Sequence, residues 1–342
     1  MQALVTLILS LFFISLSHAN DAAFGGSGAL PMPIKESRIA MVSEKITIDG
    51  SHLSQENMSG RWHYRCEFNF LNTANKSIDL TMGFPFPINE GLGDIATPKG
   101  VTVNKGDPLV YDFRVSMAGK RLVSKKQAIA PDEERELFYT QAYLWPMHFK
   151  PRQTIKLTHQ YSSGVTQDVM GYDWVTYVLK TGSLWKDGKI GETLIEVTPN
   201  TPSRLCYEIN KESYLKPQPL GLKIVGKGAH RKYVWKLKQF TPNKDVNLCL
   251  MTANNFVLYK VVYPIISNPE QLKARLKKLS TPELRILRNS IYARHGRLFK
   301  SALLKRHFKA QWWYQANPNY ADSMLDDDDK KAIAIILSIE KR

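Results

Sequence analysis

Four side chains suited to binding an anion lie within one short run of the sequence, from Arg288 to His295. We predict that Arg288, Tyr292, Arg294 and His295 form a pocket that is both cationic and aromatic. A planar guanidinium group can hold a phosphate or a carboxylate through two parallel hydrogen bonds. These residues are therefore candidate binding residues for a phosphate or carboxylate group of a glycan.

His295 also has a structural interpretation. At 100° per residue, a helix places His295 on one stripe with Leu284, Leu287 and Ile291, so its imidazole ring points towards the core. Its position in the last helical turn favours a protonated ring beside the unpaired carbonyl groups of the helix end. A capping or core hydrogen bond is therefore favoured for His295 over a catalytic role, and the binding pocket is the alternative.

A second group of aromatic side chains follows at 312–314. Exposed aromatic rings beside amide side chains commonly bind sugars, so Trp312 and Trp313 are further candidate binding residues. Aromatic residues also dominate the cores of small domains, and packing explains the two rings equally well. Both interpretations stay open for this segment.

Signatures of known catalytic centres are missing from the sequence, which has no HExxH, CxxC or GxSxG motif. The acids from Asp132 to Glu136 suit the first turns of a short helix at 131–139 better than glycosidase chemistry. The acids from Asp326 to Asp329 lack EF-hand spacing and suit a helix start. His159 falls on the apolar face of its strand, as a core histidine would. We expect no catalytic residue, no metal site and no cofactor, and enzymatic activity is disfavoured.

The first nineteen residues have the features of a secretory signal peptide. Residues Leu4 to Leu16 form an apolar stretch of leader length, and Ser17 and Ala19 provide small side chains for signal peptidase. We expect cleavage after Ala19 and no transmembrane anchor in the mature chain. The protein is therefore predicted to be extracytoplasmic, either periplasmic or secreted.

The rest of the chain divides into two regions by the period of its apolar residues. Residues 20–262 alternate with period two between Pro and Gly turns, which favours an all-β region of antiparallel sandwich layers. Whether this region is one domain or two, divided near residue 165, is left open. From Asn268 the period is helical, with start signals at Pro269 and Pro282 and a stop signal at Gly296. We predict a small all-α domain over 267–342.

Three cysteines in an exported chain allow one disulfide and one free thiol. Alternation in the strand 62–70 places Cys66 on the apolar face, as a buried free thiol. In the predicted strands 204–209 and 246–250, Cys206 and Cys249 both fall opposite the apolar residues, which suits a bond between neighbouring strands. We predict a disulfide between Cys206 and Cys249, which would add roughly 4 kcal/mol in the chain-entropy model.

The pentapeptide at 292–296, which reads YARHG, lies in its helical setting and resembles the namesake motif of the YARHG domain. The resemblance covers about residues 281–340 and includes Phe299, Leu303, Phe308, the aromatic run 312–314 and the closing amphipathic helix. It implies a small extracytoplasmic bacterial domain of unestablished biochemical role. No catalytic residue follows from it.

The β region has a resemblance of its own, carried by the segments 43–48, 83–87, 158–161 and 177–185. These segments are similar to an uncharacterised family of exported bacterial β-rich proteins, over about residues 20–260. The resemblance implies an exported β-rich body, and it too supplies no catalytic residue.

The net charge of +16 is concentrated near the carboxyl terminus, since residues 267–309 hold 12 Lys and Arg against 2 Asp and Glu. Such a segment is attracted to polyanions. Outside the cytoplasm these are anionic lipids, lipopolysaccharide or wall polymers, and we expect no nucleic-acid partner.

These patterns predict an exported cell-envelope protein of binding or scaffold type. Its basic helical domain would contact anionic envelope polymers or lipids, or another envelope protein. The alternative is an envelope hydrolase or an accessory subunit of one. That alternative requires a cleft that joins distant carboxylates, or a His–carboxylate pair.

Overall fold

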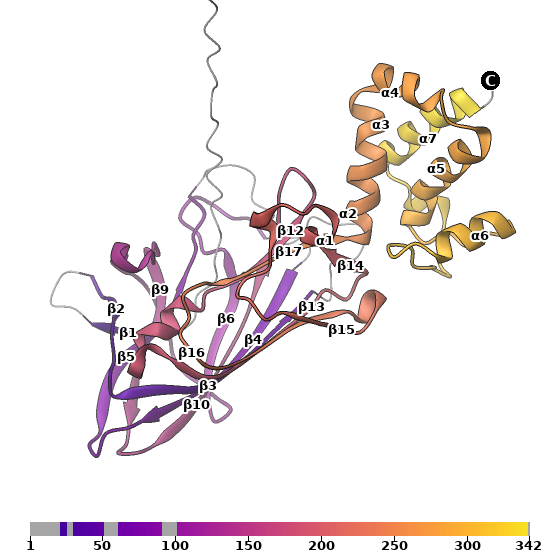
Figure 1. The fold of residues 1–342 in the computed structure, drawn as a ribbon. Coiled ribbons are helices and arrows are strands. Elements are labelled where there is room, and N and C mark those ends of the chain that lie inside the picture. Colours follow the sequence, from indigo (N-terminus) through magenta and orange to yellow (C-terminus); the bar gives the residue numbers. More distant parts are fainter. Residues whose placement is uncertain (1–20, 26–29, 51–60, 91–100, 341–342) are drawn as a thin grey trace, which may run out of the picture.

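The computed structural model describes residues 21–25, 30–50, 61–90 and 101–340. A β-rich body is followed by a helical domain at one end of it (Figure 1). The predicted fold class, a β-rich region before a small helical region, is confirmed. The predicted signal peptide at residues 1–19 lies outside the described residues.

The strands form three sheets, here given in spatial order. The first contains β2 (Met32–Ile34), β1 (Ala22–Gly25), β5 (Ile78–Phe86), β9 (Gln141–Phe149) and β8 (Lys125–Ala128). The second contains β15 (Lys223–Val225), β16 (Lys232–Phe240), β13 (Ile190–Thr198), β3 (Ile39–Asp49), β4 (Arg61–Asn72), β10 (Thr154–Gly164), β6 (Val110–Met117) and β7 (Lys120–Arg121). The third contains β11 (Thr166–Gln167), β12 (Asp173–Tyr177), β17 (Val246–Thr252) and β14 (Ser203–Leu205).

The two halves of the β region share one sheet and one core. Strand β13, which follows residue 165, pairs in parallel with β3, which precedes it, while the other strand pairs are antiparallel. One hydrophobic cluster contains Ile46 and Phe68 from the first half together with Ile195 and Trp235 from the second. In the described residues, the two halves therefore share a sheet and a hydrophobic cluster, and a division near residue 165 stays a prediction.

Alternation along β4 shows why this sheet buries one face. Trp62, Tyr64, Cys66, Phe68 and Phe70 are all buried, and the residues between them are more exposed. A strand turns successive side chains to opposite faces, so the apolar set enters the core as a unit. Cys66 is a buried free thiol, as predicted from this pattern.

The helical domain begins directly after strand β17. Thr252 accepts a hydrogen bond from the Asn255 amide and starts the first helix, ahead of the boundary expected at residue 267. The apolar stretch after it continues as helix because Val262 and Ile265 are buried in the core of the helical domain. The helices are α2 (Ala253–Val257), the π-helical turn η6 (Leu258–Val262), α3 (Tyr263–Ser267), α4 (Pro269–Leu276), α5 (Thr281–Arg294), α6 (Ala302–Lys309) and α7 (Asp327–Glu340).

Two local predictions differ from the structure. The segment 131–139 contains only the single 3₁₀ turn η1 (Glu133–Arg135), because its charged residues give no apolar stripe that could pack as a longer helix. The predicted strand 204–209 becomes the short helix α1 (Cys206–Ile209) after β14. The remaining 3₁₀ turns are η2 (Lys180–Leu184), η3 (Lys186–Gly188), η4 (Ser213–Leu215), η5 (Gly228–His230) and η7 (Asp322–Met324).

None of the helices in the described ranges combines the length and the apolar character that a membrane crossing needs.

Candidate functional site

Arg294 and His295 lie at the buried end of α5, against acids that open α7. The guanidinium group of Arg294 is 2.8 Å from an Asp326 oxygen and 3.1 Å from an Asp329 oxygen, and the Arg294 side chain is only 3% exposed. The Nε2 atom of His295 lies 2.7 Å from the other carboxylate oxygen of Asp329. His295 therefore makes a core hydrogen bond, and its partner is a carboxylate instead of the carbonyl groups of the helix end.

The other two members of the predicted pocket are also engaged within the domain. Arg288 holds Glu340 of α7 through two hydrogen bonds, of 2.8 and 3.1 Å. The ring of Tyr292 lies under the guanidinium group of Arg297, at 4.7 Å from its centroid. These side chains thus contact partners within the chain. Ligand binding by Arg288, Tyr292, Arg294 and His295 stays a prediction.

The acids at the start of α7 begin a helix, as predicted, and they also hold α5. Asp326 accepts a hydrogen bond from the Asp329 amide at 2.8 Å, which satisfies a free N–H group of the first turn. The same two carboxylates face Arg294. The arginines and the acids are each evident in the sequence, but their pairing across 32 residues is not.

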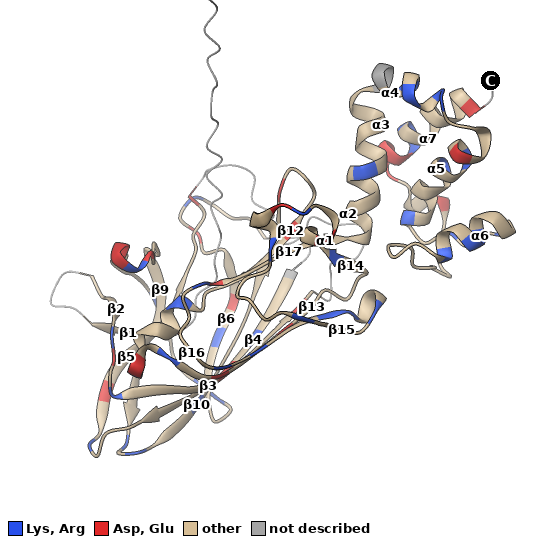
Figure 2. Ribbon diagram, in the orientation of Figure 1, with Lys and Arg blue, Asp and Glu red and all other residues tan. Residues whose placement is uncertain are grey.

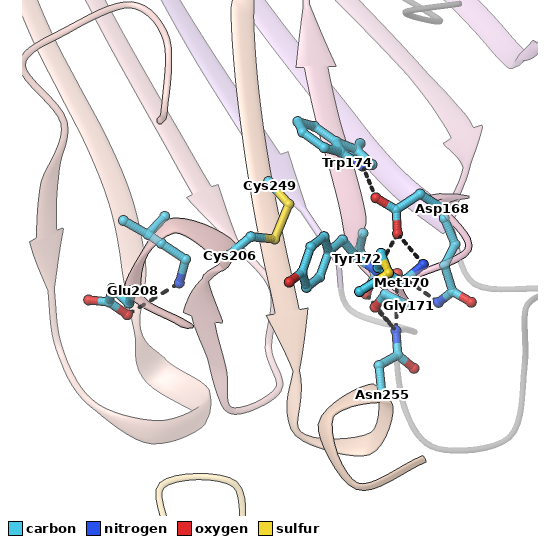
Figure 3. Close-up of a disulfide and its surroundings, with 12 residues drawn as sticks. Asp168, Met170, Gly171, Tyr172, Trp174, Cys206, Glu208, Cys249 and Asn255 are labelled. Carbon is cyan, nitrogen blue, oxygen red and sulfur yellow. Dashed lines mark hydrogen bonds between the residues drawn. A yellow bond between two sulfur atoms is a disulfide. The ribbon is translucent and has the colours of Figure 1, made fainter. Parts of the chain in front are cut away.

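The predicted disulfide is confirmed: Cys206 and Cys249 are bonded, with their Cα atoms 5.4 Å apart. The bond joins helix α1 to strand β17, although two neighbouring strands had been expected (Figure 3). Both sulfur atoms belong to a buried cluster with Tyr172, Leu215 and Met251. The disulfide therefore fastens α1 to the third sheet, next to the start of the helical domain.

Trp312 and Trp313 pack where the helical domain meets the β body. Trp313 is 6% exposed and lies against Phe308 and Phe256. Trp312 packs against the disulfide cluster and edge-on against Phe256, with the guanidinium group of Arg204 over its ring at 5.1 Å. The two rings contribute to this junction, and sugar binding by them stays a prediction.

A buried carboxyl group links the third sheet to the same junction. Asp173 of β12 accepts hydrogen bonds from Gln167 at 3.0 Å and from Asn255 of α2 at 3.2 and 3.3 Å. Burial raises the pKa of Asp173 to about 7, although the hydrogen bonds from Gln167 and Asn255 oppose the shift. The network couples the protonation of one carboxyl group to the packing of α2.

The loop 168–171 lies next to this network. Asp168 accepts hydrogen bonds from the amides of Met170 and Tyr172 and from the indole of Trp174 (Figure 3). Gly171 has φ of +75°, and a Cβ atom at that position would lie 2.2 Å from the ring of Tyr259. A glycine is needed here because both the backbone angle and the close approach of η6 exclude a side chain.

Helix α6 carries three exposed basic residues that are close together. Lys305, Arg306 and Lys309 are exposed, and no ion pair holds them within the described residues. They line an open hollow of about 480 Å³ together with Ala302 and Ala310. Figure 2 shows basic positions and no acidic ones along this helix. The opposite face of α6 buries Leu304 and Phe308, so the three cations are fixed on the solvent side.

Helix α4 and the turn after it present a second set of cations. Arg275, Lys277 and Lys278 are exposed, and among the described residues none of the three is in an ion pair. They flank the buried side chain of Leu276. Among the described residues, the exposed cations of the segment 267–309 that are outside ion pairs therefore include an α4 set and an α6 set, with Arg285 and Lys300 as further single positions.

The structure contains His–carboxylate pairs, which bear on the hydrolase alternative. The Nε2 atom of His159 lies 3.3 Å from an Asp21 oxygen, and both side chains are fully buried, so a substrate cannot reach them. Burial lowers the pKa of His159 to about 3 and, with the charge of Glu44, raises the pKa of Asp21. The pair of His148 and Asp79 lies in open solvent, at 54% and 82% exposure.

Carboxylates also meet in a groove of about 430 Å³ on the outer face of the eight-stranded sheet. Glu67 there is held by Arg65 at 2.9 Å and by Lys156 at 3.4 Å, and Glu192 is held by Lys238 at 3.2 Å. Each of these acids is thus neutralised by a neighbouring cation. In the described ranges, no three His, Cys, Asp or Glu side chains are grouped so that they could hold a metal ion.

Comparison with known proteins places the chain in a family. Residues 259–341 match the family model of the YARHG domain. The crystal structure of a candidate nutrient-binding protein from Legionella pneumophila matches with a TM-score of 0.86 and 48% sequence identity, over 94% of this chain and 100% of that chain. The chain belongs to the family of this Legionella protein.

Other comparisons add little to this assignment. An M1 zinc metallopeptidase from Deinococcus radiodurans shares 6% identity with a TM-score of 0.29, over 64% of this chain and 43% of that chain. A likeness at this level assigns neither a fold nor an activity. Among curated proteins, none matches the chain. The YARHG domain and the Legionella relative both fit a non-catalytic binding protein of this family.

Proposed function

We propose that the chain is an exported, non-catalytic binding protein of the cell envelope whose YARHG domain contacts anionic envelope polymers through helix α6. The observation that carries the proposal is the group of exposed cations formed by Lys305, Arg306 and Lys309 around one open hollow. Phosphate and carboxylate groups of a polymer are the ligands that such a group attracts.

The distribution of ion pairs supports α6 over α5 as the contact surface. A buried arginine that is paired with two carboxylates, as Arg294 is, has its charge already balanced inside the domain. The α6 cations keep their charge available to an outside partner. Cations near a helix end also complement the helix dipole, but that effect explains neither the hollow nor the presence of three together.

Several further observations support export and a binding role. A disulfide is expected in a chain that folds outside the reducing cytoplasm. YARHG domains occur in extracytoplasmic proteins, and the Legionella relative is named for nutrient binding. The β body shares one large hydrophobic cluster among its sheets, and it packs against the helical domain at the disulfide cluster. This packing would hold the α6 surface in a fixed orientation.

The proposal is tested by reversing the charge of α6 in the full chain. We expect the triple variant Lys305→Glu, Arg306→Glu and Lys309→Glu to lose most of its co-sedimentation with isolated envelope material, at least tenfold at about 0.1 M salt. Purified anionic wall polymer and vesicles with anionic phospholipid serve as separate probes, so that polymer binding and lipid binding are distinguished.

The matched control is the α4 set, with Arg275→Glu, Lys277→Glu and Lys278→Glu. It makes the same change in net charge in the same domain. Binding that stays within about twofold of wild type supports a local site on α6. An equal loss in both variants would show that only overall charge matters, and binding to vesicles but not to polymer would replace the polymer by the membrane surface.

A further inference from the structure

The edge of the eight-stranded sheet at β15 brings together an exposed strand edge, apolar side chains and cations. In the part of the chain that the structure describes, strand β15 pairs with β16 alone, so alternate backbone groups on its other side face outward. Its three residues are all exposed, including Ile224 at 38% and Val225 at 55%. Leu220, just before the strand, is 75% exposed.

The charge around this edge is strongly positive. Residues 211–232 contain six Lys and Arg and one Glu. Lys223 and Lys227 are exposed beside the apolar side chains, and neither is in an ion pair within the part of the chain that the structure describes. The edge is therefore amphipathic, with an unsatisfied backbone, apolar side chains and cations in one short segment.

We propose that the β15 edge, meaning Leu220 to Lys227, binds an extended acidic segment of a partner protein as an added strand. An extended segment can satisfy the free backbone groups of an edge strand, and alternate side chains then supply specificity. Charge decides between possible occupants: a second copy of this chain would bring its own cations to the edge, and like charges across a strand pair are unfavourable.

The register of β15 predicts the pattern of the partner. Ile224 lies opposite Tyr233 of β16 and shares its core-side face, so a partner residue next to Ile224 should be apolar. Lys223 and Val225 lie on the other face, where Val225 is opposite Lys232. A partner residue beside Lys223 should therefore be acidic. The expected motif places an acid next to an apolar residue.

Edge strands are often protected by shortness and by lysine, and β15 has both properties. Protection alone, however, does not account for three large apolar side chains exposed at the same edge. The opposite edge of the same sheet, β7, carries Lys120 and Arg121 without apolar side chains in the strand. The β7 edge therefore serves as the comparison for a strand edge that cations alone protect.

The test uses the full chain and a fluorescent octapeptide of alternating Asp and Val as the probe. Fluorescence anisotropy should show binding that weakens at least tenfold in Lys223→Glu with Lys227→Glu. The matched variant Lys120→Glu with Arg121→Glu makes the same charge change at the β7 edge and should bind within about twofold of wild type. Circular dichroism of both variants checks that the fold is kept.

Three results would overturn the proposal. One is an equal loss of binding in the two variants. Another is equal binding of a peptide in which the same residues form one block of Asp and one block of Val, because net charge alone would then explain the binding. The third is a concentration-dependent dimer that Lys223→Glu with Lys227→Glu abolishes, which would assign the edge to a second copy. New hydrogen-exchange protection of the amides at 223–225 on adding the probe supports strand addition.

Discussion

Asp329 shows at the scale of one residue how the YARHG motif stabilises its domain. Its carboxylate is fully buried and faces both Arg294 and His295. Removing one partner of a buried ion pair leaves the other charge without compensation, which commonly costs 3–5 kcal/mol. The arginine and histidine of the motif therefore act first as structural residues that join α5 to α7.

We predict that Asp329→Asn lowers the free energy of unfolding by about 3 kcal/mol, because the buried Arg294 then loses its charged contact with Asp329. Urea denaturation measures the change. The control is Asp328→Asn, which removes a surface pair with Lys331 and should cost less than about 1 kcal/mol. Equal effects of the two substitutions would contradict the structural role of Asp329.

Asp173 gives the protein a predicted pH dependence. Its pKa is about 7 in the folded chain and near the ordinary 3.8 in the unfolded chain, so the folded state binds the extra proton between these values. The contribution of Asp173 to the free energy of unfolding is complete below about pH 4. It falls by up to about 4 kcal/mol as the pH rises to about 7. Protonation favours the folded state here because the charged form is desolvated.

We therefore predict that Asp173→Asn removes from the stability profile the loss that Asp173 causes as the pH rises from 4 to 7. His159 acts in the opposite direction, since its pKa is about 3 when folded, and stability is lost as the pH falls below about 6.5. The difference between wild type and the variant at each pH isolates Asp173, because both proteins retain His159. Parallel profiles for the two proteins, measured by thermal unfolding, would rule out this role.

At the scale of elements, the disulfide joins α1 to β17 beside the start of the helical domain. We predict that Cys206→Ser with Cys249→Ser lowers the free energy of unfolding by roughly 4 kcal/mol, because the bond closes a loop of 43 residues. Tryptophan fluorescence should also shift to the red, since Trp312 packs on the same cluster. Wild type with reductant provides the control, and an unchanged urea midpoint would contradict the prediction.

Elements with a long regular pattern were predictable from the sequence. The alternation of β4 identified its buried face and the free thiol of Cys66, and the start and stop signals of α5 at Pro282 and Gly296 match the helix. Short segments were not predictable in this way. The cysteine pairing at 204–209 was correct although the local structure is helical, because a segment of this length fits a strand or a helical turn equally well.

The site residues show a different limit of sequence analysis. The types and spacing of Arg288 and Arg294 suit an anion site, yet their partners lie in α7, which is far away in the sequence. Whether a cation is paired depends on tertiary contacts that no local pattern contains. In the described residues, the unpaired cations of α6 can be told apart from the paired cations of α5 only when the positions of the acids of α7 are known.

At the scale of the whole molecule, the basic surface of α6 lies in the helical domain, at one end of the β body (Figure 1). The disulfide cluster, the Trp312 contacts and the Asp173 network all lie at the junction between them. A fixed junction would let a partner at the β15 edge and a polymer at α6 be held in one arrangement. The two proposed surfaces use different residues, so each can be removed without the other.

The salt dependence of binding by the full chain tests the central claim most directly. Between about 0.1 M and about 1 M salt, the screening length in water falls from ~10 Å to ~3 Å. We predict that wild-type protein is released from isolated envelope material across this range, and that the α6 triple variant is scarcely retained even at the lower salt. Retention that salt does not change, or that the α6 variant shares with wild type, would contradict the proposed contact.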